Sequence, residues 1–182
     1  DIAVAGDVDA IGPALAMAWE GTFFPLLPGK GLYRIVLHQP LVTSGSWEGI
    51  HNIDISLITG SIEDDLSHRD FTVDAMALPL RWTKDWVGSI IDPFGGRKDL
   101  AAGCLRAVSE EALDADPLRL LRAVRLSAEL VFYIDEDTEK AIERRVALLS
   151  QVSPERVCEE LSRMLATPRA ADALRQADEL GI

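Results

Sequence analysis

Apolar and polar residues follow one period in the first part of the chain and another in the rest. Up to about residue 103, short apolar or alternating runs end in turn residues, which is typical of strands. The predicted strands are 1–6, 32–40, 51–59, 71–80 and 86–92. After residue 103, apolar residues recur at helical spacing. The helices predicted there are 109–113, 117–131, 136–150, 154–166 and 168–179. The pattern therefore predicts an α/β region, 1–103, followed by an all-helical region, 104–182.

Local signals refine this outline within the α/β region. A helix is predicted at 8–20, and another begins at Ser61, whose spacing to Asp64 is that of a capping box. The stretch "PLLPGKG", residues 25–31, predicts a turn. The glycine pair at 95–96 precedes a short predicted helix, where it serves either to bind phosphate or to make a tight turn at positive φ. We favour the tight turn.

The composition is that of an ordinary globular protein, with 48% hydrophobic and 26% charged residues. No run of about 18 apolar residues occurs, so no transmembrane helix is predicted. A net charge of −12 argues against broad electrostatic binding to nucleic acid but is compatible with a local basic site. Cys104 and Cys158 lie far apart and outside any CxxC motif, which favours reduced thiols in a cytosol-like compartment.

Two acidic residues lie among the apolar residues of predicted strands. Asp1 opens the first strand, and Asp54 lies in the middle of "NIDIS". Strand acids that meet at one end of a sheet can hold Mg²⁺, which binds carboxylates together with substrate phosphates. Asp7 and Asp9 form a competing D-x-D motif at a helix start, where aspartates commonly cap, and we interpret them as structural.

Charged residues also interrupt the predicted strand at 71–80. Arg69 and Asp70 precede it, and Asp74 lies within its apolar pattern. An ionised carboxylate in such a strand is costly unless it is paired or binds a ligand. Taken alone, the motif favours a structural ion pair between Arg69 and one of the two aspartates.

Three arginines recur at intervals of three in "DADPLRLLRAVR". Arg119, Arg122 and Arg125 form a slowly winding row on a predicted helix that starts at Asp116, a residue suited to capping, and a following proline. One interpretation pairs this row with acids of the preceding helix. The other makes it a set of forked donors for phosphate and base edges.

Together, these motifs resemble those of class II (bacterial-type) tRNA nucleotidyltransferases and the related poly(A) polymerases. "HRDFTVDAMAL" is similar to the family's R-R-D-F-T-[IV]-N-A-[ML]-A, and "IIDPFGGRKDL" to its D-P-F-G-G-x-x-D-L. "DADPLRLLRAVR" resembles the start of its E-D-P-x-R-[IL]-L-R-A-x-R motif, and "VSPERVCEEL" resembles I-S-x-E-R-[IV]-x-x-E-[LF]. "DIAVAGD" is similar to the end of the family's D-[IL]-D-[IL]-x-V-x-G-D strand. The motifs occur in the family's order and cover nearly the whole chain.

The resemblance implies an α+β fold. We expect a polymerase beta-like nucleotidyltransferase head with a mixed sheet at 1–103, incomplete at its N-terminus, a helical neck at 104–150 and the start of a helical body at 151–182. It also implies two Mg²⁺ ions and transfer of a nucleotide from CTP or ATP to the 3′-hydroxyl of tRNA or another RNA, with release of pyrophosphate. The expectation is a cytoplasmic CCA-, CC- or A-adding enzyme; the alternatives are a poly(A) polymerase and a non-catalytic RNA-binding domain.

The resemblance also assigns roles to individual residues. Asp1 and Asp54 correspond to two of the family's catalytic, metal-binding acids. Asp116 and Arg119 correspond to the pair that reads the base, since a carboxylate accepts from the amino group of cytosine or adenine and a guanidinium donates to ring nitrogen or carbonyl. The other expected nucleotide-binding residues are Arg69, Asp70, Asp74, Arg122 and Arg125.

Among the departures of the chain from the family pattern, three bear most on the site. The family's first acid and its G-G-x-V-R-D segment would lie before Asp1, so we interpret the chain as a fragment and expect 1–182 alone to be inactive. The connection from Asp54 to Ser61 is shorter than the family's flexible loop, which indicates either a deletion, as in CC-adding enzymes, or residues missing from the sequence. Asp74 replaces the family's asparagine.

Overall fold

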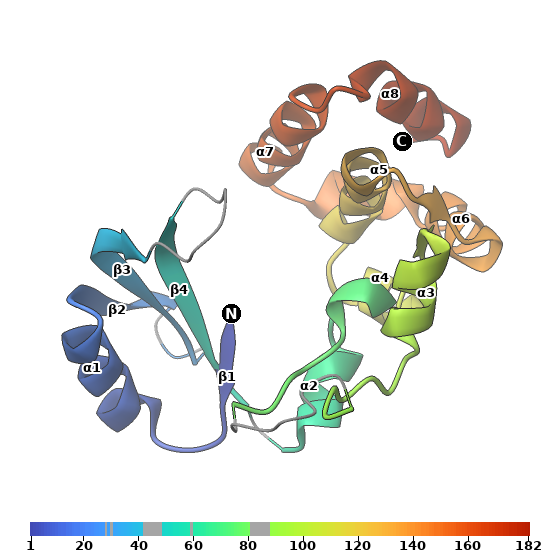
Figure 1. Cartoon of the computed structure of the whole chain (residues 1–182). Coiled ribbons are helices and arrows are strands. Elements are labelled where there is room, and N and C mark those ends of the chain that lie inside the picture. The colour runs from blue at the N-terminus through green and yellow to red at the C-terminus, as the bar shows by residue number, and fades with distance from the viewer. Residues whose placement is uncertain (28, 30, 42–48, 59, 81–87) are drawn as a thin grey trace. The chain divides into compact units, whose positions relative to one another are not determined.

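The computed structural model describes residues 1–27, 29, 31–41, 49–58, 60–80 and 88–182. These residues divide into two units, Asp1–Asp65 and Leu66–Ile182, and each unit is described by itself. The first unit contains a mixed sheet and the second is mostly helical, which confirms the predicted α+β fold class (Figure 1). Among the helices of the described residues, none has the length and apolar character needed to cross a membrane.

A four-stranded sheet forms most of the first unit. Its order is β1-β4-β3-β2, with β1 parallel to β4 and the other neighbours antiparallel. The strands are β1 (Ile2–Val4), β2 (Gly21–Leu27), β3 (Leu32–Leu41) and β4 (Ile50–Leu57). Helix α1 (Val8–Ala18) packs against β2, β3 and β4 (Figure 1). The Oδ1 atom of Asp7 accepts the Ala10 N–H at 3.2 Å, so Asp7 caps this helix as predicted.

The strands of this sheet separate an apolar face from a charged one. Ile35 and Ile55 are buried in a cluster with Val8 and Ala16 of α1. Successive residues of a strand point to opposite faces, so Arg34 and Asp54 lie on the face away from α1. Burial of the apolar face thus fixes which side of the sheet carries the charged residues.

The predicted turn at 25–31 is wrong at its start, because β2 continues through Gly21–Leu27. Pro25 disfavours a strand in the sequence pattern, since proline cannot donate a ladder hydrogen bond. β2 lies at the edge of the sheet, where a strand tolerates proline because one side of its backbone needs no partner strand. Residues 28 and 30 lie outside the described residues.

The second unit is built around helix α5 (Leu118–Leu130), against which α7 (Pro154–Leu165) and α8 (Ala170–Glu179) pack (Figure 1). Leu120 and Val124 of α5 are fully buried in the same apolar cluster as Met164 and Ala173. Helix α2 (Ile62–Ser67) begins in the first unit and ends in the second. The remaining elements of the second unit are η1 (Thr72–Asp74), α3 (Gly96–Ala102), β5 (Cys104–Leu105), α4 (Glu110–Ala115), β6 (Tyr133–Ile134), α6 (Glu136–Glu143) and η2 (Val146–Gln151). Every helix predicted after residue 103 is confirmed, although 136–150 is split into α6 and η2.

The strands predicted at 71–80 and 86–92 are wrong. Phe71 forms an isolated bridge with Ala107, the chain then turns through η1, and Ala77 forms a second bridge with Ile91. The Asp74 carboxylate accepts the Phe71 N–H at 3.1 Å, and this local bond stabilises a turn in place of a strand. Residues 81–87 lie outside the described residues.

The predicted helix start at Ser61 and the predicted tight turn at the glycine pair 95–96 are both confirmed. The Asp64 N–H donates to Ser61 Oγ and the Ser61 N–H donates to Asp64 Oδ2, each at 3.1 Å, which is a capping box. Gly95 adopts a φ of 77° just before α3. A Cβ atom on Gly96 would lie 2.0 Å from the carbonyl oxygen of Thr72, so this position excludes any larger residue. The glycine pair therefore makes a tight, closely packed turn.

Candidate functional site

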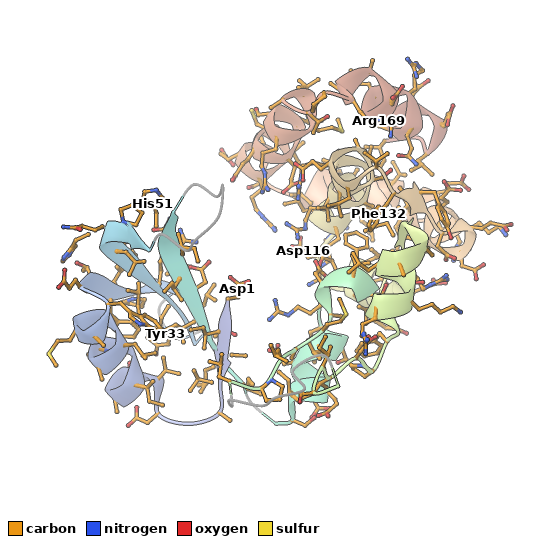
Figure 2. The ribbon with its side chains drawn as sticks, in the orientation of Figure 1. Asp1, Tyr33, His51, Asp116, Phe132 and Arg169 are labelled. Atoms are coloured by element: carbon orange, nitrogen blue, oxygen red, sulfur yellow. The ribbon has the colours of Figure 1, made fainter. Side chains whose placement is uncertain are left out.

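The two predicted metal-binding acids lie on neighbouring strands of the first unit. Ile2 of β1 pairs in parallel with Ile55 of β4, so the register places Asp1 and Asp54 side by side, one residue before that pair. Both stand on the face away from α1, by the alternation of the strands. Figure 2 shows Asp1 at the start of β1. The structure therefore brings these two acids together as expected.

Asp54 already has a cationic partner in the same sheet. Its two carboxylate oxygens accept from Nε and Nη2 of Arg34 at 2.6 and 2.8 Å. This bidentate pair holds the pKa of Asp54 below its ordinary value, despite partial burial, so the carboxylate is ionised at neutral pH. About a third of each side chain remains exposed, 34% for Arg34 and 29% for Asp54.

The donor chemistry of this acid pair fits Mg²⁺, which prefers carboxylate oxygens and completes its shell with water and substrate phosphates. The pair is nevertheless a small donor set. Over the residues that the structure describes, no group of three or more His, Cys, Asp or Glu side chains gathers as a metal site would. Asp1 and Asp54 can thus supply part of a metal site, with the remaining ligands to come from elsewhere.

Asp70 and Arg122, both predicted to bind nucleotide, bind each other in the second unit. Arg122 Nε donates to Asp70 Oδ2 at 2.6 Å, and its guanidinium lies 3.8 Å from Glu160 of α7. Asp70 is 6% exposed, whereas the Arg122 side chain is 31% exposed. Asp70 therefore anchors Arg122, and Arg122 keeps an accessible surface.

Arg125 is buried deep between α5 and α7. It is 2% exposed, and its Nε donates to Glu160 Oε2 at 2.6 Å while Nη1 donates to Glu129 Oε2 at 2.5 Å. Both partners are carboxylates of the chain itself. The position of Arg125 therefore favours a role in holding α5 to α7 over the predicted contact with a nucleotide.

The predicted base-reading residues lie at the start of α5. Asp116 Oδ1 accepts the Leu118 N–H at 3.2 Å, which caps the helix, and Arg156 of α7 donates to both carboxylate oxygens at 3.2 and 2.7 Å. The Asp116 side chain is 29% exposed. Figure 2 labels it at this end of α5.

Arg119 connects the start of α5 to two other segments of the second unit. Its Nη1 donates to the carbonyl oxygens of Ala112 and Arg69 at 2.8 and 3.3 Å, and its Nη2 donates to that of His68 at 2.7 Å. Arg69 is half-buried in this segment. Arg119 thus holds the "HRD" segment next to the start of α5.

The structure adds three residues that sequence reasoning had not assigned: Arg34, Arg156 and Glu160. Arg156 and Glu160 stand in the motif "VSPERVCEEL", four residues apart and hence on one face of α7. In the sequence, the four-residue spacing of these two charged residues already indicated that they share one face of a helix. The signal for Arg34 was a charged residue in an otherwise apolar part of a strand.

A surface cavity of about 290 Å³ lies between α5 and α8, away from these residues. Its lining includes Ser127, Phe132, Arg169 and Gln176, of which Figure 2 labels Phe132 and Arg169. None of the predicted site residues belongs to its lining. Arg169 is paired with Asp172 at 3.2 Å, and the cavity takes no part in the site described here.

Comparison with known proteins supports the motif resemblance. The family "Poly A polymerase head domain" matches residues 41–106, and "Probable RNA and SrmB- binding site of polymerase A" matches residues 131–182. A CCA-adding enzyme of Geobacillus stearothermophilus is 39% identical over 165 residues, which cover 90% of the chain and 38% of that enzyme. A CC-adding tRNA nucleotidyltransferase of Halalkalibacterium halodurans is 45% identical over 122 residues, or 65% of the chain and 31% of the relative.

Solved structures agree with these sequence matches. A Thermotoga maritima CCA-adding enzyme complexed with tRNA superposes with a TM-score of 0.82 and 26% identity, covering 98% of the chain and 41% of the enzyme. The chain thus spans well under half the length of the relatives it matches. Two family matches in the expected order, relatives across most of the chain and a shared fold lead to one conclusion: the chain belongs to the family of class II tRNA nucleotidyltransferases and poly(A) polymerases.

Proposed function

We propose that this protein adds C, A or both to the 3′ end of tRNA without a template, using CTP and ATP and releasing pyrophosphate. The proposal rests on one observation: 90% of the chain matches a CCA-adding enzyme. The chain also contains the predicted acid pair and the predicted base-reading pair. The cytoplasm, where tRNA is processed in bacteria, is the proposed setting.

In this proposal, Asp1 and Asp54 hold Mg²⁺ on the exposed face of the sheet. The metal supplies activation of the attacking 3′-hydroxyl and stabilisation of the leaving phosphate oxygen. Arg34 keeps Asp54 ionised and fixes the orientation of its carboxylate by two hydrogen bonds. Because those bonds occupy both oxygens, metal binding requires Arg34 to give up or share at least one of them.

Asp116 and Arg119 read the base in this proposal. The amino group of cytosine or adenine donates to the Asp116 carboxylate, whereas uracil and guanine present a carbonyl there, which repels it. Arg156 holds both oxygens of that carboxylate, and Arg119 is held by three backbone carbonyls. Hydrogen bonds within the chain therefore pre-position both side chains, which supports selectivity.

Replacing Asp116 with asparagine tests this role without removing the side chain. We expect the CTP-to-UTP ratio of kcat/KM to fall by about tenfold or more, because an amide can donate to the uracil carbonyl and one such contact is worth about 1–3 kcal/mol. The measurement is single-nucleotide addition with each triphosphate. Arg119→Ala is a poorer probe, since it also removes donors from three backbone carbonyls.

Asp114→Asn is the matched control for Asp116→Asn. It removes the same charge two residues earlier, from a carboxylate that pairs with Arg145 at 2.7 Å and is 50% exposed. The control should leave the CTP-to-UTP ratio unchanged. An equal loss of CTP and UTP use in Asp116→Asn would argue that Asp116 only caps the helix.

A poly(A) polymerase is the second candidate, because the description of one matched family names poly(A) polymerase and that of the other names polymerase A. It would extend an RNA with many adenylates from ATP alone. The tRNA enzyme would stop after the nucleotides of the CCA end, so product length separates the two.

A further inference from the structure

Two carboxylates of the second unit converge on one backbone amide. The Phe71 N–H lies 3.2 Å from Asp70 Oδ1 and 3.1 Å from Asp74 Oδ1. Because both Oδ1 atoms bond the same nitrogen, the two carboxyl groups lie close to each other. Asp70 is buried, and Asp74 is exposed as a residue, but its carboxyl group turns inward to this amide.

The charges around the pair favour one shared proton. Arg122 of α5 donates to the other oxygen of Asp70, and its second acidic neighbour, Glu160 of α7, lies 3.8 Å away. On the side of α3, Asp99 accepts the Thr72 hydroxyl at 2.7 Å and a further bond from Arg106 at 3.1 Å, which adds a carboxylate close to η1. Arg106 compensates Asp99, which leaves Arg122 as the guanidinium bonded to Asp70, and Glu160 also lies near Arg122. Two adjacent carboxylates in such a place favour a state in which one of them carries a proton.

The pKa values of the pair move in opposite directions. Partial burial and the Asp70 carboxylate raise the pKa of Asp74 to about 7. Burial opposes ionisation of Asp70, but its hydrogen bonds to Asp74 and Arg122 lower its pKa below the ordinary value. Asp74 is therefore the member that holds the proton, and Asp70 stays ionised against Arg122.

We propose that Asp74 is a positioning residue for nucleotide binding, which donates a shared proton to Asp70 and so keeps Asp70 in place to orient Arg122. The inference rests on the proposed function, because Arg122 is a predicted contact of the nucleotide. The family motif has an asparagine at this position, whose amide can donate at every pH. Aspartate donates only when protonated, so nucleotide binding by this protein weakens as the pH rises through neutrality.

The proton on Asp74 can be detected by a stability measurement, which does not require enzymatic activity. A carboxyl group with a raised pKa in the folded state stabilises the fold below the pKa of the unfolded chain, and loses this stabilisation as the pH rises through about 7. We expect Asp74→Asn to remove this dependence, so that the gap between its melting temperature and the wild-type value widens from pH 5.5 to about 7 and then stays constant up to pH 8.5. Asp137→Asn, which removes an exposed charge from α6, is the control and should follow the wild type.

The positioning role is measured by the KM for CTP and ATP, with Mg²⁺, in the full-length protein. From pH 6 to 8.5 we expect the wild-type KM to rise by about tenfold, while that of Asp74→Asn stays near the low-pH wild-type value. Asp74→Ala, which cannot donate, should have a high KM at both pH values.

The two measurements separate the possible failures. If the melting temperatures of the wild type and Asp74→Asn depend on pH in the same way, the shared proton is overturned. If the two melting temperatures diverge with pH but the wild-type KM does not depend on pH, the positioning role alone is overturned. If the two melting temperatures diverge with pH but the protein uses neither CTP nor ATP at any pH, the proposed function is refuted. The role of Asp74 in nucleotide binding is then refuted with it.

Discussion

Replacing Glu160 with glutamine is expected to lower the free energy of unfolding by about 3 kcal/mol, because it leaves the buried Arg125 guanidinium without its main counter-charge. Arg125 is 2% exposed and Glu160 is 5% exposed, and their hydrogen bond measures 2.6 Å. Glu129 remains as the second partner of Arg125, which places the expected loss at the lower end of the range for a broken buried pair. Urea unfolding of the purified chain measures the effect.

Glu159→Gln is the matched control, since it makes the same change one residue earlier, at an exposed position of α7. It should alter stability by less than about 0.5 kcal/mol, as surface substitutions usually do. Replacing both Arg125 and Glu160 with apolar residues of similar volume should restore much of the loss, because neither charge is then left buried alone. A Glu160→Gln protein as stable as the control would show that the pair does not hold α5 to α7.

Asp54→Asn is expected to reduce the rate of nucleotide transfer by about 10³-fold, which corresponds to about 4 kcal/mol of lost transition-state stabilisation. An amide binds Mg²⁺ much more weakly than a carboxylate does. Single-turnover addition of CTP at saturating Mg²⁺ measures the loss. The fold should be retained, because the pair with Arg34, about a third exposed, contributes at most about 1 kcal/mol.

Glu63→Gln serves as the control for Asp54→Asn, because it neutralises an exposed acid of α2 in the same unit. Its transfer rate should equal that of the wild type. An Asp54→Asn enzyme that keeps its rate within about tenfold of wild type would mean that Asp54 serves the sheet through Arg34 and does not hold the metal.

Local chemistry made much of the fold predictable. The helices after residue 103 follow from the apolar spacing along each segment, and Asp7 and Ser61 cap helices at the predicted places. The errors arose where a local hydrogen bond or an edge position overrode the pattern. Asp74 turns the chain at a predicted strand, and β2 tolerates Pro25 because it lies at the edge of the sheet.

The residue types of the candidate site were predictable, but their partners were not. The row of three arginines looked uniform in sequence, yet Arg122 is partly accessible and Arg125 is buried. What separates them is the position of Glu160, 35 residues after Arg125, which only the packing of α7 on α5 determines. The same holds for Arg156 on Asp116, 40 residues apart, and for Arg34 on Asp54, 20 residues apart.

Nucleotide addition by the full-length protein tests the central claim most directly. The substrates are tRNAs that end before the CCA sequence, after its first C and after its second C, each offered one labelled triphosphate with Mg²⁺. The proposed function predicts that C, A or both are joined at the matching steps, that addition then stops, and that UTP and GTP are not used. Failure to join any nucleotide to any of the three tRNAs would contradict it.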